Sequence, residues 1–321
     1  MKKYLITGFS GFVSAHFLNY LESLNEPVTV LGVDVNEPQI FSNYKFVDCG
    51  FKKLNLLDKK AVGEILLKFK PDFILHFASY SSVAYSWKHP VDAFVNNSNI
   101  FLNLVDQVRL LELKCRILSV GSSEEYGKIR DDEIPITEQT RINPQSPYAV
   151  ARVSQEMLSE IYANHYKVDI VLTRSFNHIG PGQKDIFVIS SFAKKLTEIK
   201  KNIIITNEIN VGNISITRDF VDVRDVVKAY YLLLQKGKVG QVYNICSGIG
   251  YTLQHILESM MGILKITPAI IVDKNLIRPD ENKIIIGSNK KIFLETNWQP
   301  NISLNESLKD IIDYWMKNNN N

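Results

Sequence analysis

A tyrosine and an arginine one helical turn apart, Tyr148 and Arg152, are the residues of this sequence best suited to proton transfer. A phenol, with a reference pKa of about 10, exchanges protons usefully near neutrality only beside a positive charge. Arg152 supplies that charge from the same face of an expected helix. Ser122 follows an expected buried strand over residues 116–120, which predicts its hydroxyl at the carboxyl end of that strand, where ligands of open α/β sheets bind. Taken alone, such a pair is more often a buried tyrosine beside a surface arginine, so the surrounding sequence has to decide.

A glycine-rich turn joins the first expected strand to the first expected helix, and its sequence is Gly8-Phe-Ser-Gly-Phe-Val-Ser14. In a dinucleotide-binding turn the first glycine permits the tight turn, the second lets the backbone approach a pyrophosphate, and the helix N-terminus supplies amide donors. Gly8 and Gly11 match these two positions. Ser14 takes the position of a third glycine, where a small side chain still allows close packing of the helix. The alternative is a plain βα turn without a ligand.

Asp34 ends the second expected strand, about 20 residues beyond the turn, as the dinucleotide-binding pattern requires. A carboxylate at this point accepts hydrogen bonds from the adenosine ribose and repels the 2′-phosphate that distinguishes NADP. Strand, turn, helix and acid therefore follow one another in the right register. The sequence predicts NAD as the cofactor, preferred over NADP.

Strands alternate with helices along the first half of the chain. The expected strands cover residues 3–7, 28–33, 72–77, 116–120 and 169–174, and the expected helices cover residues 12–24, 59–69, 93–113 and 148–166. This alternation predicts an α/β fold with a doubly wound parallel (Rossmann) sheet and a smaller C-terminal substrate-binding lobe. We expect an NAD-binding domain over residues 1–176 and the lobe over residues 177–321, interleaved with late strands of the sheet.

Composition excludes several classes of protein. Of the 321 residues, 45% are hydrophobic and 22% are charged, which is typical of a soluble globular chain. No run of about 20 apolar residues could span a membrane. The 37 Lys and Arg residues against 34 Asp and Glu give a net charge of only +3, without a basic block, so we expect neither a membrane nor a nucleic-acid partner.

The three cysteines are too scattered for a disulfide framework or a zinc site and predict free thiols. The apolar run after Met1 breaks at Gly8 and no cleavage site follows, so we expect a cytoplasmic protein. The six histidines lack metal-ligand spacing, which predicts no metal site. His76 and His178 are interpreted as packed polar residues.

The motifs together resemble the extended short-chain dehydrogenase/reductases that act on nucleotide sugars. They are Gly8-x-x-Gly11, His76-Phe-Ala78, Ser122, Tyr148 with a base at position 152, and Arg278-Pro-Asp-Glu281. Residues 121–127, 173–183, 218–225 and 287–290 are most similar to the GDP-mannose 4,6-dehydratase and GDP-4-keto-6-deoxymannose reductase group, with the reductase branch nearer. The resemblance covers nearly the full length.

The sequence departs from the family pattern near the expected cofactor. The family's Tyr-x-x-x-Lys is here Tyr148-x-x-x-Arg152, and arginine keeps the charge but loses lysine's compact geometry. Asn55 stands where the family has an aspartate on the adenine side, and Ile100-Phe101 stands where a Gly-Thr pair is usual after Asn97.

The resemblance also implies roles for individual residues. The implied catalytic residues are Ser122, Glu124, Tyr148 and Arg152. The implied cofactor-binding residues are Gly8, Ser10, Gly11, Phe12, Val13, Asp34, Asn55, Leu56, Phe77, Ala78, Ser79, Asn97, Tyr148 and Arg152. The implied substrate-binding residues are Ser81, Ser122, Ser123, Glu124, Asn177, Val188, Lys194, Arg218, Arg278 and Glu281. Arginines suit a nucleotide diphosphate because a planar guanidinium meets phosphate oxygens in bidentate fashion.

Three functions remain open on the sequence. The first hypothesis is a nucleotide-sugar 4,6-dehydratase with bound NAD, in which Tyr148 and Ser122 act at C4 and Glu124 takes the C5 proton. The second is a reductase of a GDP-4-keto-6-deoxyhexose that uses Ser122 and Tyr148 alone. The third is a nucleotide-sugar-binding protein without turnover. The sequence names neither the sugar nor, except by likeness, the nucleotide.

We also expect a homodimer. The helices expected over residues 93–113 and 148–166 carry more apolar residues than one sheet face can cover. In the family that the chain resembles, these helices pair across a two-fold axis, which gives an isologous interface. The alternative is that both apolar stripes belong to the core.

Overall fold

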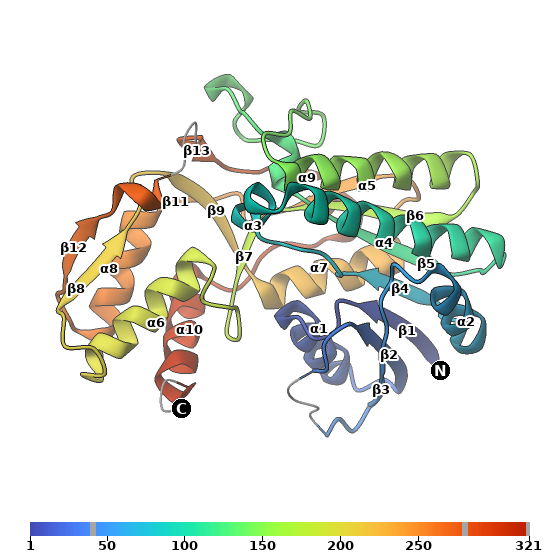
Figure 1. The fold of residues 1–321 in the computed structure, drawn as a ribbon, viewed down its shortest axis with the longest axis horizontal. Helices are drawn as coiled ribbons and strands as arrows, with labels where there is room; N and C mark the ends of the chain where they lie inside the picture. The colour runs from blue at the N-terminus through green and yellow to red at the C-terminus, as the bar shows by residue number, and fades with distance from the viewer. Residues whose placement is uncertain (39–42, 278–281, 319–321) are drawn as a thin grey trace.

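The computed structural model describes residues 1–38, 43–277 and 282–318 (Figure 1). Within them, seven parallel strands form a central sheet in the order β10-β6-β5-β4-β1-β2-β3. The strands are β1 (Lys2–Thr7), β2 (Val28–Asp34), β3 (Val47–Lys53), β4 (Phe73–His76), β5 (Arg116–Ser122), β6 (Asp169–Ser175) and β10 (Val242–Ile245). The order changes direction between β1 and β4, and ligands of such sheets bind beyond the carboxyl ends of the strands at this point. The predicted doubly wound parallel sheet is confirmed.

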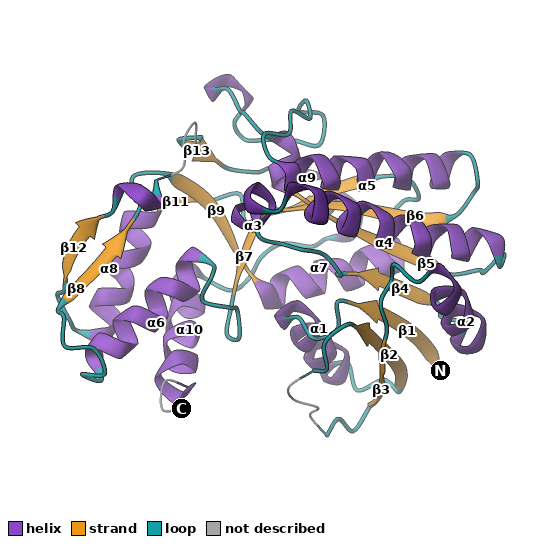
Figure 2. Cartoon of the chain, in the orientation of Figure 1, coloured by secondary structure: helices purple, strands orange, loops and turns teal. Residues whose placement is uncertain are grey.

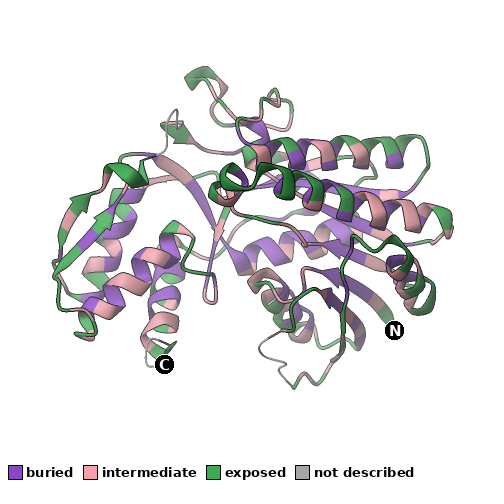
Figure 3. Cartoon of the chain, in the orientation of Figure 1, coloured by how far each residue is buried: buried purple, intermediate pink, exposed green. Residues whose placement is uncertain are grey.

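Helices cover both faces of the sheet (Figure 2). One face carries α1 (Phe12–Ser23), α7 (Val223–Lys236) and α9 (Lys290–Thr296), and the other carries α2 (Lys59–Phe69), α4 (Pro90–Leu110) and α5 (Pro147–Asn164). Side chains of a strand point to alternate faces, so Tyr4 and Ile6 of β1 pack with α1 and α7 while Leu5 packs with α2 and α4. The buried residues consequently line both sides of the sheet (Figure 3).

A smaller lobe is built from later parts of the chain. Its strands are β7 (Asn177–Ile179), β9 (Thr217–Asp222), β11 (Gly250–Thr252) and β13 (Ile284–Ile285) in one sheet, and β8 (Glu208–Val211) with β12 (Ala269–Val272) in another. Its helices are α6 (Val188–Lys200), α8 (Leu253–Leu264) and α10 (Leu304–Asn318). They enclose an apolar core that includes Phe192, Ile256 and Ile311.

The two parts of the chain are interleaved. β10, α7 and α9 all follow residue 177, yet they complete the central sheet and one of its helical layers. The division into residues 1–176 and 177–321 stays a prediction.

One helix was predicted with the wrong boundaries, and two elements were not predicted. The helix expected over residues 93–113 runs from Pro90 to Leu110, because a proline in the first turn loses no intrahelical hydrogen bond and starts a helix well. The edge strand β3 and the short helix α3 (Val83–Lys88) were not predicted. β3 exposes polar side chains along most of its length, and α3, at six residues, is too short for a helical period to show.

Among the described residues, no helix combines the length and apolar character needed to cross a bilayer. The three cysteines are free thiols, as predicted. In the same described ranges, no group of three His, Cys, Asp or Glu side chains is arranged to bind a metal ion.

Candidate active site

The glycine turn after β1 packs tightly on the loop that follows β4. Gly8 has a φ of 67°, and a Cβ added there would lie 2.6 Å from the backbone nitrogen of Ala78. Such a contact excludes any side chain, so the turn requires glycine. Gly11 N donates to Gly8 O at 3.0 Å, and the buried Ser14 donates from Oγ to the same oxygen at 3.1 Å. The small residue at position 14 thus closes the turn against the sheet.

The Asp34 carboxylate lies at this turn. Its Oδ2 accepts a hydrogen bond from Ser10 N at 3.0 Å, and its Oδ1 accepts one from Asn36 N at 3.0 Å. Ser10 Oγ donates to Asn36 O at 2.5 Å. The structure therefore brings Ser10, Gly11 and Asp34 together at the carboxyl ends of β1 and β2, as the dinucleotide-binding pattern predicted.

Phe12 and Val13 begin α1, and each has a place in the packing. Val13 packs against the core shared by α1 and α7. The Phe12 ring stacks on the ring of His178, with centroids 5.7 Å apart. His178 is half-buried and its Nδ1 shares a hydrogen bond with Phe176 O at 3.3 Å, so it is a packed polar residue, as interpreted from the sequence, and burial lowers its pKa. The contact joins the first helix to the start of the smaller lobe.

The loop after β4 is fixed from two sides. Phe77 N donates to Thr7 O at 3.2 Å, and Ala78 N donates to Thr7 Oγ1 at 3.2 Å. The buried Asn97 accepts from Tyr80 N at 2.8 Å and donates to Tyr80 O at 3.1 Å. Asn97 therefore positions the loop backbone.

Other residues expected near the cofactor have structural partners of their own. Asn55 is exposed and accepts from Leu57 N at 3.0 Å, while Leu56 is buried. Ile100 and Phe101 are buried in the core between α2, α4 and the sheet. Both side chains thus belong to the apolar core.

Ser122 is the last residue of β5 and caps η1 (Ser123–Tyr126), a single turn that lies against α5. Ser122 Oγ accepts a hydrogen bond from Glu124 N at 3.2 Å, and Ser122 N donates to Glu125 Oε1 at 2.6 Å. Glu124 is exposed, whereas Glu125 is fully buried. The strand end therefore presents Ser122 and Glu124 at the surface of the site and anchors them through Glu125.

Tyr148 and Arg152 lie in the first turns of α5. Ser146 caps this helix by accepting from Ala149 N at 3.1 Å. Tyr148 is 6% exposed and Arg152 is 5% exposed, and Arg152 Nε donates to Tyr148 OH at 3.2 Å. Arg152 Nη2 also donates to Ser79 Oγ at 2.5 Å. The arginine is buried beside the phenol, so the alternative of a surface arginine is wrong.

His76 ends β4 on the other side of Arg152 and is completely buried. Its Nδ1 shares a hydrogen bond with Thr7 Oγ1 at 3.0 Å. Burial, together with the charge of Arg152, lowers the pKa of His76 to about 3. His76 is therefore neutral near pH 7 and adds no positive charge beside Tyr148.

Two buried carboxylates and one guanidinium lie directly behind Ser122, and the sequence analysis missed this cluster. Arg174 binds Glu156 in bidentate fashion, from Nε at 2.8 Å and from Nη2 at 2.5 Å, and its Nε lies 3.9 Å from Glu125 Oε2. Burial, together with the charge of Glu156, raises the pKa of Glu125 well above its ordinary range. Nothing in the sequence distinguished Glu125 from its exposed neighbour Glu124.

Glu125→Gln is expected to stabilise the protein, increasingly so as the pH rises. Above the ordinary carboxyl value of 4.5, the unfolded chain releases this proton while the folded chain retains it, so wild-type stability falls with pH. Glutamine keeps the acceptor for Ser122 N and removes this penalty. Urea unfolding at several pH values measures the difference. We expect the variant to be more stable at about pH 7.5 and the gap to close towards pH 4.5.

The matched control for this prediction is Glu64→Gln, because the Glu64 side chain is 69% exposed. It should leave the pH dependence of unfolding unchanged. A Glu125→Gln gap that stays constant over the whole pH range would show that Glu125 is ionised in the folded protein.

The expected substrate residues are only partly brought together. Asn177 of β7 and Arg218 of β9 lie on paired strands, and Asn177 Nδ2 donates to Asp219 O at 3.3 Å. Val188 is exposed at the start of α6, and Lys194 of α6 binds Asp185 at 2.7 Å. The other four are placed as follows: Ser81 is exposed just before α3, Ser123 begins η1, and Arg278 and Glu281 lie outside the described residues.

Asp219 is a second residue that the sequence analysis missed. It is completely buried and accepts hydrogen bonds from Ser247 N at 2.8 Å, Gly248 N at 2.9 Å and Gly287 N at 3.2 Å. Asp219 therefore ties two separate segments, one at Ser247-Gly248 and one at Gly287, to β9 beside Arg218. The signal in the sequence was an acidic residue between Arg218 and the apolar pair Phe220-Val221, which indicates a carboxylate in a buried strand.

Comparisons with known proteins agree with this geometry. The model of the family described as GDP-mannose 4,6 dehydratase matches residues 5–311. GDP-6-deoxy-D-mannose reductase of Pseudomonas aeruginosa is 30% identical over 98% of this chain and 97% of its own length. The dTDP-D-glucose 4,6-dehydratase of Homo sapiens is 25% identical over 100% of this chain and 90% of its own length.

Comparison with solved structures points to the same family. A solved structure of RMD from Pseudomonas aeruginosa, complexed with NADPH, superimposes with a TM-score of 0.87 and 30% identity over 99% of both chains. The resemblance was inferred in part from Gly8, Ser122 and Tyr148. The structure places them in the turn after β1, at the end of β5 and on α5. The chain belongs to the GDP-mannose 4,6 dehydratase family, within the extended short-chain dehydrogenase/reductases.

Proposed function

We propose that this protein reduces the C4 ketone of a nucleotide-linked 4-keto-6-deoxyhexose, with GDP as the nucleotide. The observation that carries the proposal is the hydrogen bond between Arg152 Nε and Tyr148 OH, two buried side chains next to the strand that ends at Ser122. Tyr148, Arg152 and Ser122 are sufficient to supply the proton and the charge stabilisation that reduction of a carbonyl requires. The end-to-end likeness to a GDP-6-deoxy-D-mannose reductase supports reduction as the direction and GDP as the nucleotide.

The residues around β1 suit a nicotinamide dinucleotide. Gly8 permits the tight turn that leads into the N-terminus of α1, and the Asp34 carboxylate lies beside that turn. Gly8, Ser10, Gly11 and Asp34 would hold the adenosine diphosphate part. When bound, the dinucleotide supplies the hydride for C4.

The protein side chains manage the proton and the developing charge. Tyr148 OH donates a proton to the C4 oxygen while Ser122 Oγ donates a hydrogen bond to it. The charge of Arg152 stabilises the phenolate that remains. The reacting oxygen therefore becomes a hydroxyl within a site whose tyrosine and arginine are excluded from bulk water.

The proposal is tested with purified protein, a GDP-4-keto-6-deoxyhexose and a reduced nicotinamide cofactor. We expect consumption of the cofactor and a product heavier than the substrate by two hydrogens. Binding of the nucleotide sugar without any turnover would contradict the proposal and would favour the third function, a binding protein.

A 4,6-dehydratase is the second candidate, because Glu124 lies two residues beyond Ser122 and is exposed at the site. In that reaction Glu124 would take the C5 proton after oxidation at C4, and water would leave from C6. A GDP-hexose would then lose one water without added reduced cofactor. Glu124→Gln would lower this loss by about 10²–10⁴, the usual contribution of a general base, whereas it would leave carbonyl reduction nearly unchanged.

We predict that the protein binds NADH more tightly than NADPH. The 2′-phosphate of NADPH would face the Asp34 carboxylate, and repulsion in this half-buried position should cost about 5–150-fold in affinity, or roughly 1–3 kcal/mol. The related Pseudomonas structure is complexed with NADPH. The predicted preference for NADH therefore does not come from that relative and rests on Asp34 of this chain. Direct titration with both cofactors measures it, and Asp34→Asn should reduce the difference. Equal affinities for wild type would remove this role of Asp34.

We predict a homodimer formed through α4 and α5. The two helices contact each other and expose several large apolar side chains, namely Val91, Phe94, Val95, Val150, Met157 and Ile161. Burial of these side chains against a second copy removes apolar surface from water. Light scattering should give the mass of two chains, and Ile161→Glu should give the mass of one. A wild-type monomer mass independent of concentration would contradict the prediction.

A further inference from the structure

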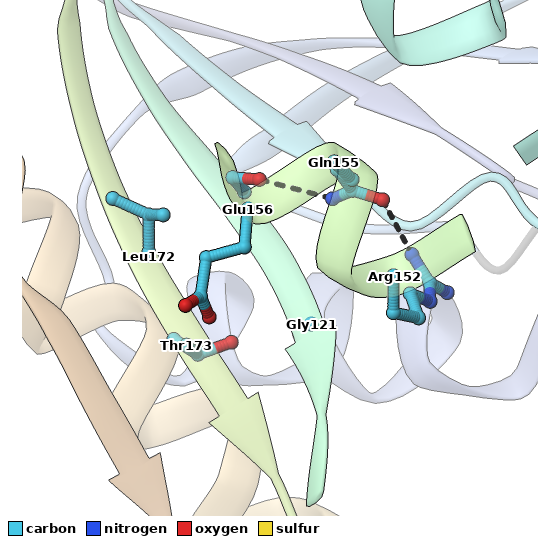
Figure 4. A pocket seen from close by; sticks show the side chains of 7 residues that line it. Gly121, Arg152, Gln155, Glu156, Leu172 and Thr173 are labelled. Carbon is cyan, nitrogen blue, oxygen red and sulfur yellow. Dashed lines mark hydrogen bonds between the residues drawn. The ribbon is translucent and has the colours of Figure 1, made fainter. Parts of the chain in front are cut away.

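Gln155 is a buried side chain of α5, one turn beyond Arg152, and the proposed mechanism does not use it. Its Oε1 accepts a hydrogen bond from Arg152 Nη1 at 2.8 Å (Figure 4). Its Nε2 donates to Ser119 Oγ at 2.9 Å and to Val120 O at 3.2 Å. Ser119 Oγ also shares a hydrogen bond with Ser159 Oγ at 2.9 Å. Both ends of the Gln155 amide are therefore fixed.

The guanidinium of Arg152 is surrounded by acceptors. Nε donates to Tyr148 OH, Nη1 donates both to Gln155 Oε1 and to Val120 O at 3.0 Å, and Nη2 donates to Ser79 Oγ. These N–H groups lie in one rigid plane. Rotation of that plane would break several hydrogen bonds at once, so the surrounding acceptors determine which N–H faces the phenol.

An arginine needs this alignment more than a lysine does. The ammonium of lysine is a compact charge on a flexible stem and has no preferred plane. In this chain the family's lysine is replaced by Arg152. The position of a planar group beside Tyr148 must therefore be set by a further residue.

We propose that Gln155 is the positioning residue that orients the Arg152 guanidinium so that Nε–H faces the Tyr148 oxygen. Gln155 acts through Arg152, and Ser119 fixes Gln155 in turn. The inference rests on the proposed function in taking Tyr148 as the proton-transfer group. The inference holds for the reductase and for the 4,6-dehydratase, because both reactions use the Tyr148 phenol.

The first test is Gln155→Glu, which keeps the shape and places a carboxylate against Arg152. The carboxylate offsets the charge that stabilises the phenolate, so Tyr148 should ionise at a higher pH in the variant. The signal of Tyr148 is isolated by ultraviolet difference titration, from spectra of each protein with and without the change Tyr148→Phe. This measurement needs no substrate, so it remains informative if no turnover is found.

The second test is Gln155→Met, which removes the acceptor without adding charge. We expect kcat for C4 reduction to fall about tenfold, the rate equivalent of one hydrogen bond to a charged group, with KM for the nucleotide sugar within about twofold. In an Arg152→Lys background the same change should lower kcat by less than about threefold, because a lysine has no plane to orient. Gln107→Met on α4 is the matched control and should change neither value.

The outcomes separate the two claims. An unchanged Tyr148 titration in Gln155→Glu would overturn the positioning role even if the enzyme is active. An equal loss of kcat from Gln155→Met in both backgrounds would assign Gln155 a merely structural role and would also overturn it. If no 4-keto sugar is turned over, a Tyr148 titration that Gln155→Met shifts in the wild-type background but not in the Arg152→Lys background would support the positioning role and contradict the proposed function.

Discussion

Replacing Tyr148 by phenylalanine is expected to lower kcat for C4 reduction by about 10²–10⁴, the usual contribution of a positioned general acid. The hydroxyl is the only part removed, and the buried ring keeps its place beside Arg152. KM for the nucleotide sugar should therefore change little. Steady-state rates with a GDP-4-keto-6-deoxyhexose measure both values.

Tyr162→Phe is the matched control for this prediction. Tyr162 lies on the same helix and is also buried, and its hydroxyl donates to Asp106 Oδ1 at 3.1 Å, away from the site. The control should keep wild-type rates. A Tyr148→Phe protein that reduces its substrate at the wild-type rate would require a different proton donor.

Arg152→Met is expected to lower kcat by about 10²–10³, similar to the loss of one preorganised donor at a reacting oxygen. The substitution removes the positive charge beside Tyr148 and leaves an unbranched side chain of similar length. The phenol then keeps its proton to higher pH, so the midpoint of the pH–rate profile should rise. Stopped-flow rates over a range of pH values test both effects.

The control here is Arg109→Met on α4, where the arginine pairs with Asp106 at the helix surface. It removes one positive charge from the protein but none from the site. A pH–rate midpoint that shifts equally in both variants would reflect net charge, and the assigned role of Arg152 would then be wrong.

The fold of the first half could be predicted because its elements are long and regular. β1, α1 and β2 surround a turn whose glycines and acid have fixed spacing, and residues 116–120 contain the apolar residues Ile117, Leu118 and Val120 of a buried strand. β3 was missed because apolar and polar residues alternate only weakly along this edge strand. Many strands of the smaller lobe were missed because they have only two to four residues, and such lengths carry no measurable period.

The candidate site was only partly predictable for a different reason. Ser122, Tyr148 and Arg152 belong to motifs that can be recognised by type and spacing. Glu125 and Gln155 owe their importance to burial and to partners distant in sequence, since Gln155 binds Ser119 and Glu125 lies against Glu156 and Arg174. Such partners become visible only when the sheet and α5 are assembled.

The most direct test of the central claim follows the hydrogen atoms in a single turnover. Wild-type protein is mixed in heavy water with a GDP-4-keto-6-deoxyhexose and NADH that carries deuterium at the transferred position of its nicotinamide ring. The account predicts a product with the deuterium from NADH at C4, no water lost, and no solvent deuterium at C5. A protein that leaves NADH unconsumed, and instead removes water from a GDP-hexose with solvent deuterium appearing at C5, would contradict it.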